Sequence, residues 1–213
     1  MILRSKDIAE LLRNIRKSKD PLVITPTPDI TKLESDCDAS VDLRLGSWFV
    51  MLKQAKLSCM DIDDANMDID DAKINGAQRY TRTHYVRFGD EFILHPRSFV
   101  LGTTLEWIRL PRNLAAIVTG KSSWGRRGLI IATATGIHPG FSGCLTLEIT
   151  NLGEIPIKIS PGIHICQLFV HEMTKATDRA AKSKFAVSRK PRFAIIKKDQ
   201  FAGLLSNPKE GKD

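Results

Sequence analysis

The sequence predicts a mainly β protein, a distorted antiparallel β-barrel or jelly roll with a short N-terminal helix and a basic C-terminal tail. Two observations carry this prediction. Short, β-branched apolar runs follow one another through residues 85–173, and Gly, Pro, Asn and Asp turns separate them at near-regular intervals. Such spacing is typical of antiparallel barrels and jelly rolls rather than of βαβ units.

The composition fits one soluble globular domain. A chain of 213 residues can bury one sizeable core or two small ones. No apolar run approaches the roughly 20 residues that span a bilayer, and the N-terminus turns polar too early for a signal peptide. The four cysteines are scattered and share no CxxC spacing, so we expect no disulfide, no Cys-ligated zinc and a reducing cytoplasm.

The first half of the chain predicts a helix and then strands. Ser5 is placed to cap a helix whose apolar face is spaced i, i+3, i+4, i+7; that face consists of Ile8, Leu11, Leu12 and Ile15. Three prolines within residues 17–28 end the helix. Residues 40–45 alternate polar and apolar up to Gly46, which predicts a strand, and residues 48–52 form the next.

An internal acidic repeat, MDIDDAN followed by MDIDDAK, lies within residues 58–73. Six aspartates within eleven residues repel one another, which favours an exposed loop. A calcium loop of the EF-hand type is the sharper alternative. It is disfavoured because the glycine at the sixth position and the glutamate at the twelfth are both absent.

The turn Gly120-Lys121-Ser122-Ser123, with Arg126 after it, could bind a phosphate. Phosphates are bound where backbone N–H groups, hydroxyls and cations converge. A Walker A loop is excluded because GxxxxGK is missing, and an ordinary surface turn remains the alternative.

Glu148 is the candidate for proton chemistry. Alternation in residues 144–150 places Leu145, Leu147 and Ile149 on one strand face and Glu148 on the other. A carboxylate inside a barrel is desolvated, which raises its pKa toward the range useful for proton transfer. A solvated or ion-paired glutamate is the alternative.

His138 lies in the turn Ile137-His138-Pro139-Gly140, where a surface histidine is the default interpretation. The histidines form no HxE…PCxxC arrangement, so the zinc-deaminase site is absent.

The positive charge belongs to the tail. After Met173, eleven Lys or Arg oppose four Asp or Glu, which gives +7 of the chain's net +8. The tail, residues 174–213, is either solvated or able to close over a phosphorylated ligand or touch nucleic acid. With few aromatics and no RNA-binding motif, a nucleic-acid arm is the weakest of these interpretations.

Several ordered motifs resemble the trimeric dCTP deaminase/dUTPase superfamily, with dCTP deaminase as the nearer branch. They are MILRSKDI, SVDLRLG, FILHPRSFVLGTTLEWIRLP, GKSSWGRRGL, TGIHPGFSG and LTLEITNLGEIPIKISPGIHICQLFVHEM. The resemblance covers residues 1–173, the expected domain, and leaves residues 174–213 as a tail that could form an active-site lid.

The resemblance implies a dUTPase-like β-clip fold, a homotrimer with active sites between subunits, and dCTP deamination to dUTP without zinc. Glu148 would activate the water that attacks C4 of cytosine, and Mg²⁺ would bind through the triphosphate rather than at a dedicated metal site. The substrate contacts carried over by position are Lys121, Ser122, Ser123, Arg126, Thr133, Ala134, His138, Thr146, Leu147 and Lys184.

The sequence departs from the family pattern at four places. Lys121 replaces an arginine, which turns a bidentate fork into a point charge. His138 replaces an aspartate that orients the hydrolytic water in the dUTPase branch, which argues against dUTP pyrophosphatase activity. Residues 130–136 are one position shorter and lack the usual histidine, and the Lys-Tyr pair of the lid survives only as Lys184-Phe185.

We therefore predict a dCTP deaminase, or a deaminase of a related deoxycytidine nucleotide. The alternative of another class is a nucleotide-binding or regulatory protein on the same fold, with catalysis weakened by the changes at His138 and in the lid.

Overall fold

The computed structural model describes residues 1–53, 81–179 and 187–191. Met1–Met51 and Thr83–Arg192 form one compact unit, and a second unit comprises Leu52–Arg82 and Phe193–Asp213. The acidic repeat and Lys184 lie outside the described residues, so the predictions about them stay predictions.

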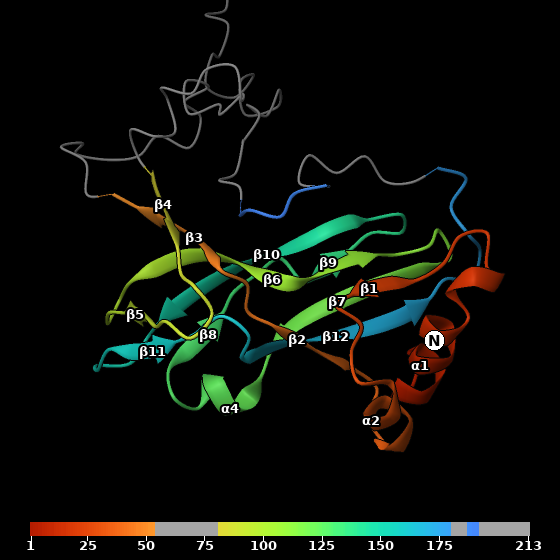
Figure 1. Cartoon of the computed structure of the whole chain (residues 1–213), viewed down its shortest axis with the longest axis horizontal. Coiled ribbons are helices and arrows are strands. Elements are labelled where there is room, and N and C mark those ends of the chain that lie inside the picture. Colours follow the sequence, from red (N-terminus) through yellow and green to blue (C-terminus); the bar gives the residue numbers. More distant parts are fainter. Residues whose placement is uncertain (54–80, 180–186, 192–213) are drawn as a thin grey trace, which may run out of the picture. The chain divides into compact units, whose positions relative to one another are not determined.

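Strands dominate the described part of the chain (Figure 1). The helical segments are α1 (Ser5–Arg13), the 3₁₀ turn η1 (Ile15–Lys17), α2 (Ile30–Ser35) and α4 (Ser122–Gly125). The strands are β1 (Val23–Thr25), β2 (Val41–Arg44), β3 (Trp48–Leu52), β4 (Thr81–Tyr85), β5 (Phe92–Leu94), β6 (Phe99–Arg109), β7 (Leu114–Gly120), β8 (Leu129–Ile131), β9 (Gly136–Ile137), β10 (Ser142–Asn151), β11 (Ile157–Ile159) and β12 (His164–Glu172).

The strands form three sheets. The largest has the order β4-β3-β6-β10-β8, with β1 also pairing to β6, and the second has the order β2-β12-β7-β9. β5 and β11 form a two-stranded ribbon. The registered pairs of all three sheets are antiparallel, which confirms the predicted fold class. In the described residues these sheets do not close into one barrel.

The pattern of β10 shows how the sequence builds the large sheet. Leu145, Leu147 and Ile149 are buried, whereas Thr146 and Glu148 are half-buried, as the alternation predicts. A register shift between Cys144 and Thr146 marks a bulge against β6.

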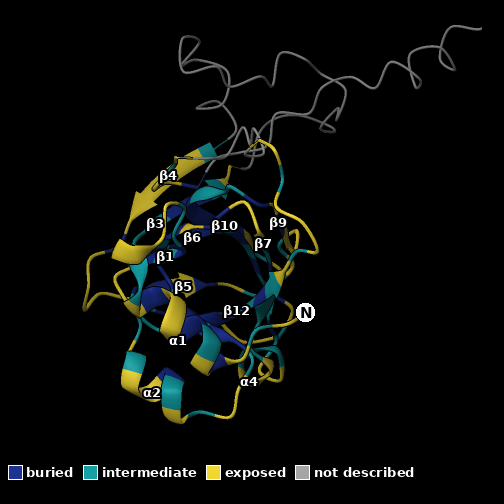
Figure 2. Ribbon diagram, turned by 90° about the vertical axis from the view of Figure 1, so that its right-hand side faces the viewer, coloured by how far each residue is buried: buried dark blue, intermediate teal, exposed yellow. Residues whose placement is uncertain are grey.

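One hydrophobic core joins the two larger sheets. Buried side chains of β6 and β10 belong to the same cluster as those of β7 and β12, and Ile8 and Leu12 of α1 extend it. Figure 2 shows these buried positions in dark blue among the strands. In the described ranges no helix is both long and apolar enough to cross a membrane.

The prediction that Ser5 caps the first helix is wrong. Arg4 occupies the cap position, and its backbone N–H donates to the carboxylate of Asp7 at 3.1 Å. The Ser5 hydroxyl is fully buried and donates instead to the backbone carbonyl of Asp38 at 2.6 Å. It therefore ties α1 to the segment before β2. The apolar face is confirmed at Ile8 and Leu12, while Leu11 is exposed.

Helix α2 was not expected from the prolines around it. It begins after Asp29, whose carboxylate accepts the backbone N–H of Lys32 at 3.1 Å, and Leu33 is its buried contact. This helix packs on α1 and lies next to β2, beside the charged cluster described below.

Candidate active site

The predicted phosphate-binding turn is a short helix rather than a plain turn. β7 ends at Gly120, Lys121 is extended, and α4 follows. Glycine suits position 120 because a Cβ there would lie 3.3 Å from the Cβ of Ile131 on β8. A residue with a Cβ at this position would require Ile131 to shift by a few tenths of an ångström.

Helix α4 is fastened to the start of β12. The indole N–H of Trp124 donates to the carbonyl of His164 at 2.8 Å, and the Lys121 N–H donates to the carbonyl of Ile165 at 3.3 Å. Ser122, Ser123 and Arg126 are exposed. The short helix thus presents two hydroxyls and a cation from a fixed backbone.

Lys121 itself points to β2, where its ammonium lies 2.5 Å from a carboxylate oxygen of Asp42. Two positions along the same strand, the Arg44 guanidinium lies 2.6 Å from Glu106, and the Arg44 backbone N–H donates to the same carboxylate at 2.8 Å. Glu106 on β6 is only 2% exposed. These four residues line a cavity of about 290 Å³ and are called the charged cluster below.

The charged cluster affects the pKa of the Cys166 thiol on β12. Burial, with smaller contributions from the nearby carboxylates of Glu106 and Asp42 and an opposing effect of Lys121, raises the pKa of Cys166 to about 12. Cys166 is completely buried, so this thiol is kept protonated and has no access to a ligand.

Reasoning from the sequence missed Asp42, Arg44 and Glu106. The one available signal was the alternation Val41-Asp42-Leu43-Arg44, which places both charges on one face of a strand. Their partners come 62 and 79 residues later in the chain, so the pairing depends on strand register.

Glu148 lies on β10 in the other sheet, across from Leu101 of β6. Its side chain is half-buried, and within the described residues its carboxylate has neither a hydrogen bond nor an ion pair. The expectation of a fully desolvated carboxylate inside a closed barrel is therefore not met in the single chain. The result is an unpaired carboxylate on a partly open sheet face.

The other predicted base-pocket residues have different environments. Thr133 accepts the backbone N–H of Glu148 at 2.8 Å, and Ala134 is exposed in the same loop. Thr146 shares the half-buried face of β10 with Glu148. Leu147 is fully buried in the core, so only its backbone is available to a ligand.

His138 is exposed in a tight turn after β9, where its carbonyl accepts the N–H of Phe141 at 3.2 Å. The structure thus places it on the surface, beyond the loop that contains Thr133 and Ala134.

The predicted site is divided between the two larger sheets. Lys121 and α4 follow β7, whereas Glu148 and Thr146 lie on β10. Glu148 is not among the residues that line the cavity at Lys121. Within the described ranges, no group of three or more His, Cys, Asp and Glu side chains is arranged to hold a metal ion.

A segment of the basic tail, residues 187–191, lies on the large sheet and is called the C-terminal strap (blue in Figure 1). The Val187 N–H donates to the carbonyl of Ser142 at 2.7 Å, and the Cys144 N–H donates to the carbonyl of Ser188 at 3.0 Å. The strap therefore pairs with the first part of β10, before the bulge.

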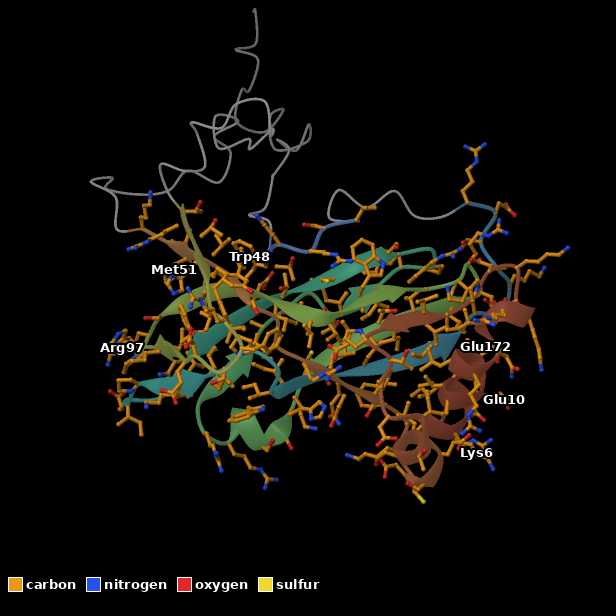
Figure 3. The ribbon with its side chains drawn as sticks, in the orientation of Figure 1. Lys6, Glu10, Trp48, Met51, Arg97 and Glu172 are labelled. Carbon is orange, nitrogen blue, oxygen red and sulfur yellow. The ribbon has the colours of Figure 1, made fainter. Side chains whose placement is uncertain are left out.

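Two cations of the strap then contact tryptophan rings of the neighbouring strands. The Arg189 guanidinium lies 5.7 Å from the ring centroid of Trp107 on β6, and the Lys190 ammonium lies 4.1 Å from the ring centroid of Trp48 on β3. Figure 3 labels Trp48 beside this segment. Because Trp48, Trp107 and Glu148 share one sheet face by register, the strap brings positive charge to the face that contains Glu148.

The fold is similar to that of a solved nucleotide deaminase. It matches the crystal structure of 2'-deoxycytidine 5'-triphosphate deaminase from Agrobacterium tumefaciens with a TM-score of 0.55 and 21% sequence identity, over 79% of this chain and 46% of that chain. The present chain therefore spans less than half the length of that protein.

The chain belongs to the dCTP deaminase-like family, whose model matches residues 2–173. It is 39% identical to the "dCTP deaminase, dUMP-forming" of Halobacterium salinarum over 84% of each chain. It is also 35% identical to the "dCTP deaminase" of Halorubrum lacusprofundi, over 98% of this chain and 93% of that relative. These matches confirm the resemblance seen in the motifs.

Proposed function

We propose that this protein is a dCTP deaminase that releases ammonia from dCTP and forms dUTP without zinc. Family membership supports the substrate class. The observation that carries the chemistry is the carboxylate of Glu148, which has no partner in the described chain although its backbone is bonded to the neighbouring loop. An unpaired carboxylate on a fixed strand is suited to proton transfer.

In the proposed reaction Glu148 takes a proton from water while the water oxygen forms a bond to C4 of cytosine, the C4=N3 double bond opens, and N3 receives that proton. Glu148 then takes the proton of the new C4 hydroxyl and passes it to the exocyclic amine, the bond from C4 to that amine breaks as the C4=O bond forms, and ammonia leaves. The carboxylate ends the cycle as it began, so one residue serves as base and then as acid.

The triphosphate would bind at the hydroxyls of Ser122 and Ser123 and the cations of Lys121 and Arg126, which α4 presents from a fixed backbone. Mg²⁺ would enter with the triphosphate, whose oxygens are the ligands that this ion prefers. Thr146, Ala134 and His138 remain proposed contacts to the nucleoside, and Lys184 a proposed contact from the tail.

Division of the site between two sheets supports a homotrimer with active sites between subunits. Glu148 is not among the residues that line the cavity at Lys121. A neighbouring copy that supplies one half of the site would bring the triphosphate-binding residues of one subunit next to Glu148 of another.

We favour dUTP over dUMP as the product. Relatives from Halobacterium salinarum and Dictyoglomus turgidum carry the name "dUMP-forming", whereas the relative from Halorubrum lacusprofundi is named "dCTP deaminase" alone. Here the exposed His138 occupies the turn position where the resemblance implies an aspartate for water activation, which removes one requirement of pyrophosphate release. Chromatography of the products, together with a pyrophosphate assay, distinguishes the two outcomes.

An ammonia-release assay with dCTP, CTP, dCMP and dUTP tests the proposal. We expect ammonia from dCTP, and we expect Glu148→Gln to bind dCTP but to lose about 10²–10⁴-fold in turnover. Glu172→Gln, at the exposed end of β12, is the matched control. Binding of dCTP by the unmodified protein without any ammonia would instead favour the regulatory alternative.

A further inference from the structure

The hydrogen bonding beside Glu148 departs from a regular antiparallel ladder. Ile149 pairs with Ile131, the last residue of β8. At the next pair, the Ala132 N–H donates to the carbonyl of Glu148 at 2.8 Å. A regular ladder would return the Glu148 N–H to the carbonyl of Ala132. Here that N–H donates to the side-chain hydroxyl of Thr133, also at 2.8 Å.

Thr133 therefore takes the place of a backbone carbonyl where β8 leaves the sheet. The substitution lets the chain turn away after Ala132 without leaving the Glu148 N–H unpaired. An unpaired backbone donor would be costly at this part-buried position.

The loop that contains Thr133 is fixed at its other end as well. The carbonyl of Thr135 accepts the N–H of Val118 on β7 at 2.9 Å, and β9 then pairs with β7. The loop, residues 132–135, thus connects β8 to β9 and is hydrogen-bonded to β10 at one end and to β7 at the other. A side chain in such a loop can hold a strand position more firmly than one in a loop anchored at a single end.

We infer that Thr133 is a positioning residue for Glu148, which it holds through the backbone amide. This inference rests on the proposed function for its catalytic consequence. A general base must stay within hydrogen-bond reach of its water, and a misplacement of about 1 Å can cost roughly 100-fold in rate. The role differs from the substrate contact that the sequence resemblance implies for Thr133.

Three variants test the inference. Thr133→Val keeps the shape but removes the acceptor, Thr133→Ser keeps the hydroxyl, and Thr135→Val is the control because Thr135 contributes its backbone carbonyl. Amide hydrogen exchange of the folded protein measures the bond directly and needs no activity. We expect exchange at the Glu148 amide to accelerate about fivefold to tenfold in Thr133→Val and to stay unchanged in the other two.

Steady-state kinetics with dCTP then measures the consequence. We expect Thr133→Val to lower kcat roughly 10- to 100-fold with KM unchanged, because the interaction acts on the base and not on the bound substrate. We expect Thr133→Ser, which keeps the hydroxyl, to have the kcat of the unmodified protein. A raised KM with unchanged kcat would identify a substrate contact and overturn the inference.

The exchange measurement and the kinetic measurement distinguish failure of the inference from failure of the proposed function. Unchanged exchange at the Glu148 amide in Thr133→Val overturns the inference whatever the enzyme does. Absence of ammonia release by the unmodified protein overturns the proposed function and, with it, the catalytic role of Thr133, even where the exchange result shows the bond itself.

Discussion

The ammonium of Lys121 lies 2.5 Å from the carboxylate of Asp42, and both side chains are less than one third exposed. The charge of Lys121 is therefore compensated before any ligand arrives. Arg126, five residues on, is exposed and has no ion-pair partner within the described chain. Although the resemblance assigns both cations to the triphosphate, the structure leaves only one of them with an uncompensated charge.

This difference predicts unequal effects on nucleotide binding. Arg126→Met should weaken dCTP binding about 10- to 100-fold, because charge-assisted hydrogen bonds contribute roughly 1.5–3 kcal/mol. Lys121→Met should weaken it by less than about fivefold, since removal of the cation also frees Asp42 to be solvated. Titration calorimetry on Glu148→Gln protein, which does not consume the nucleotide, measures both affinities.

Asp42→Asn is the control for this comparison. It frees the Lys121 charge, so it should strengthen binding of the triphosphate, with a steeper dependence on salt concentration. Equal losses in Lys121→Met and Arg126→Met would show that Asp42 does not compensate Lys121.

The separation of Lys121 and Arg126 from Glu148 predicts complementation between two impaired variants. Co-expressed Arg126→Met and Glu148→Gln chains form mixed trimers if the protein is trimeric. With one half of each site from either neighbour, roughly a quarter of the sites in a random mixture carry both native residues. At a dCTP concentration that does not saturate Arg126→Met, we expect clearly more ammonia from the co-expressed, purified mixture than from either variant alone.

A site built within one chain would behave differently, because every chain in the mixture carries one defect. Activity in mixed oligomers, verified by two affinity tags, that does not exceed the activity of the separate variants would therefore contradict the inter-subunit site. Light scattering on the unmodified protein gives the oligomeric state independently.

Local pattern in the sequence predicts the strands but not their partners. The alternation in residues 144–150 places Glu148 correctly on the less buried face of β10 because the period of a strand is a local property. The turns that bound β6, β7 and β12 are equally local, and these strands agree with the prediction.

Features that depend on long-range packing were missed. Ser5 has the sequence of a helix cap, yet its hydroxyl serves Asp38, 33 residues away. Nothing in the local sequence distinguishes Glu106 from an ordinary strand residue, yet the strand register brings its carboxylate to the guanidinium of Arg44. The hydrogen bond from Glu148 to Thr133 likewise depends on where β8 ends, which no periodicity in the sequence fixes.

The C-terminal strap predicts a measurable loss of order in a double variant. Replacement of Arg189 and Lys190 by Ala removes both cation–π contacts, each of which contributes about 0.5–1 kcal/mol at an exposed site. Exchange at the amides of Val187 and Cys144, which connect the strap to β10, should therefore accelerate roughly fivefold to thirtyfold.

Lys175→Ala with Arg179→Ala is the charge-matched control, since both residues precede the strap. If the Arg189 and Lys190 variant exchanged these two amides at the original rate, the backbone pairing alone would hold the strap. Tryptophan fluorescence offers a second readout, because the contacts involve the rings of Trp48 and Trp107.

The buried thiol of Cys166 predicts a loss of stability at alkaline pH. Burial raises the pKa of Cys166 from 9.0 to about 12, so the folded chain keeps a proton that the unfolded chain releases near pH 9. The contribution of Cys166 to stability is therefore complete below about pH 9 and is lost as the pH rises toward about 12. Urea unfolding across this range should show a smaller decline in the free energy of unfolding for Cys166→Ala than for the unmodified protein.

Cys37→Ala, at an exposed thiol, is the control and should keep the original decline. Identical slopes in all three proteins would mean that the Cys166 thiol does not contribute to the alkaline limb.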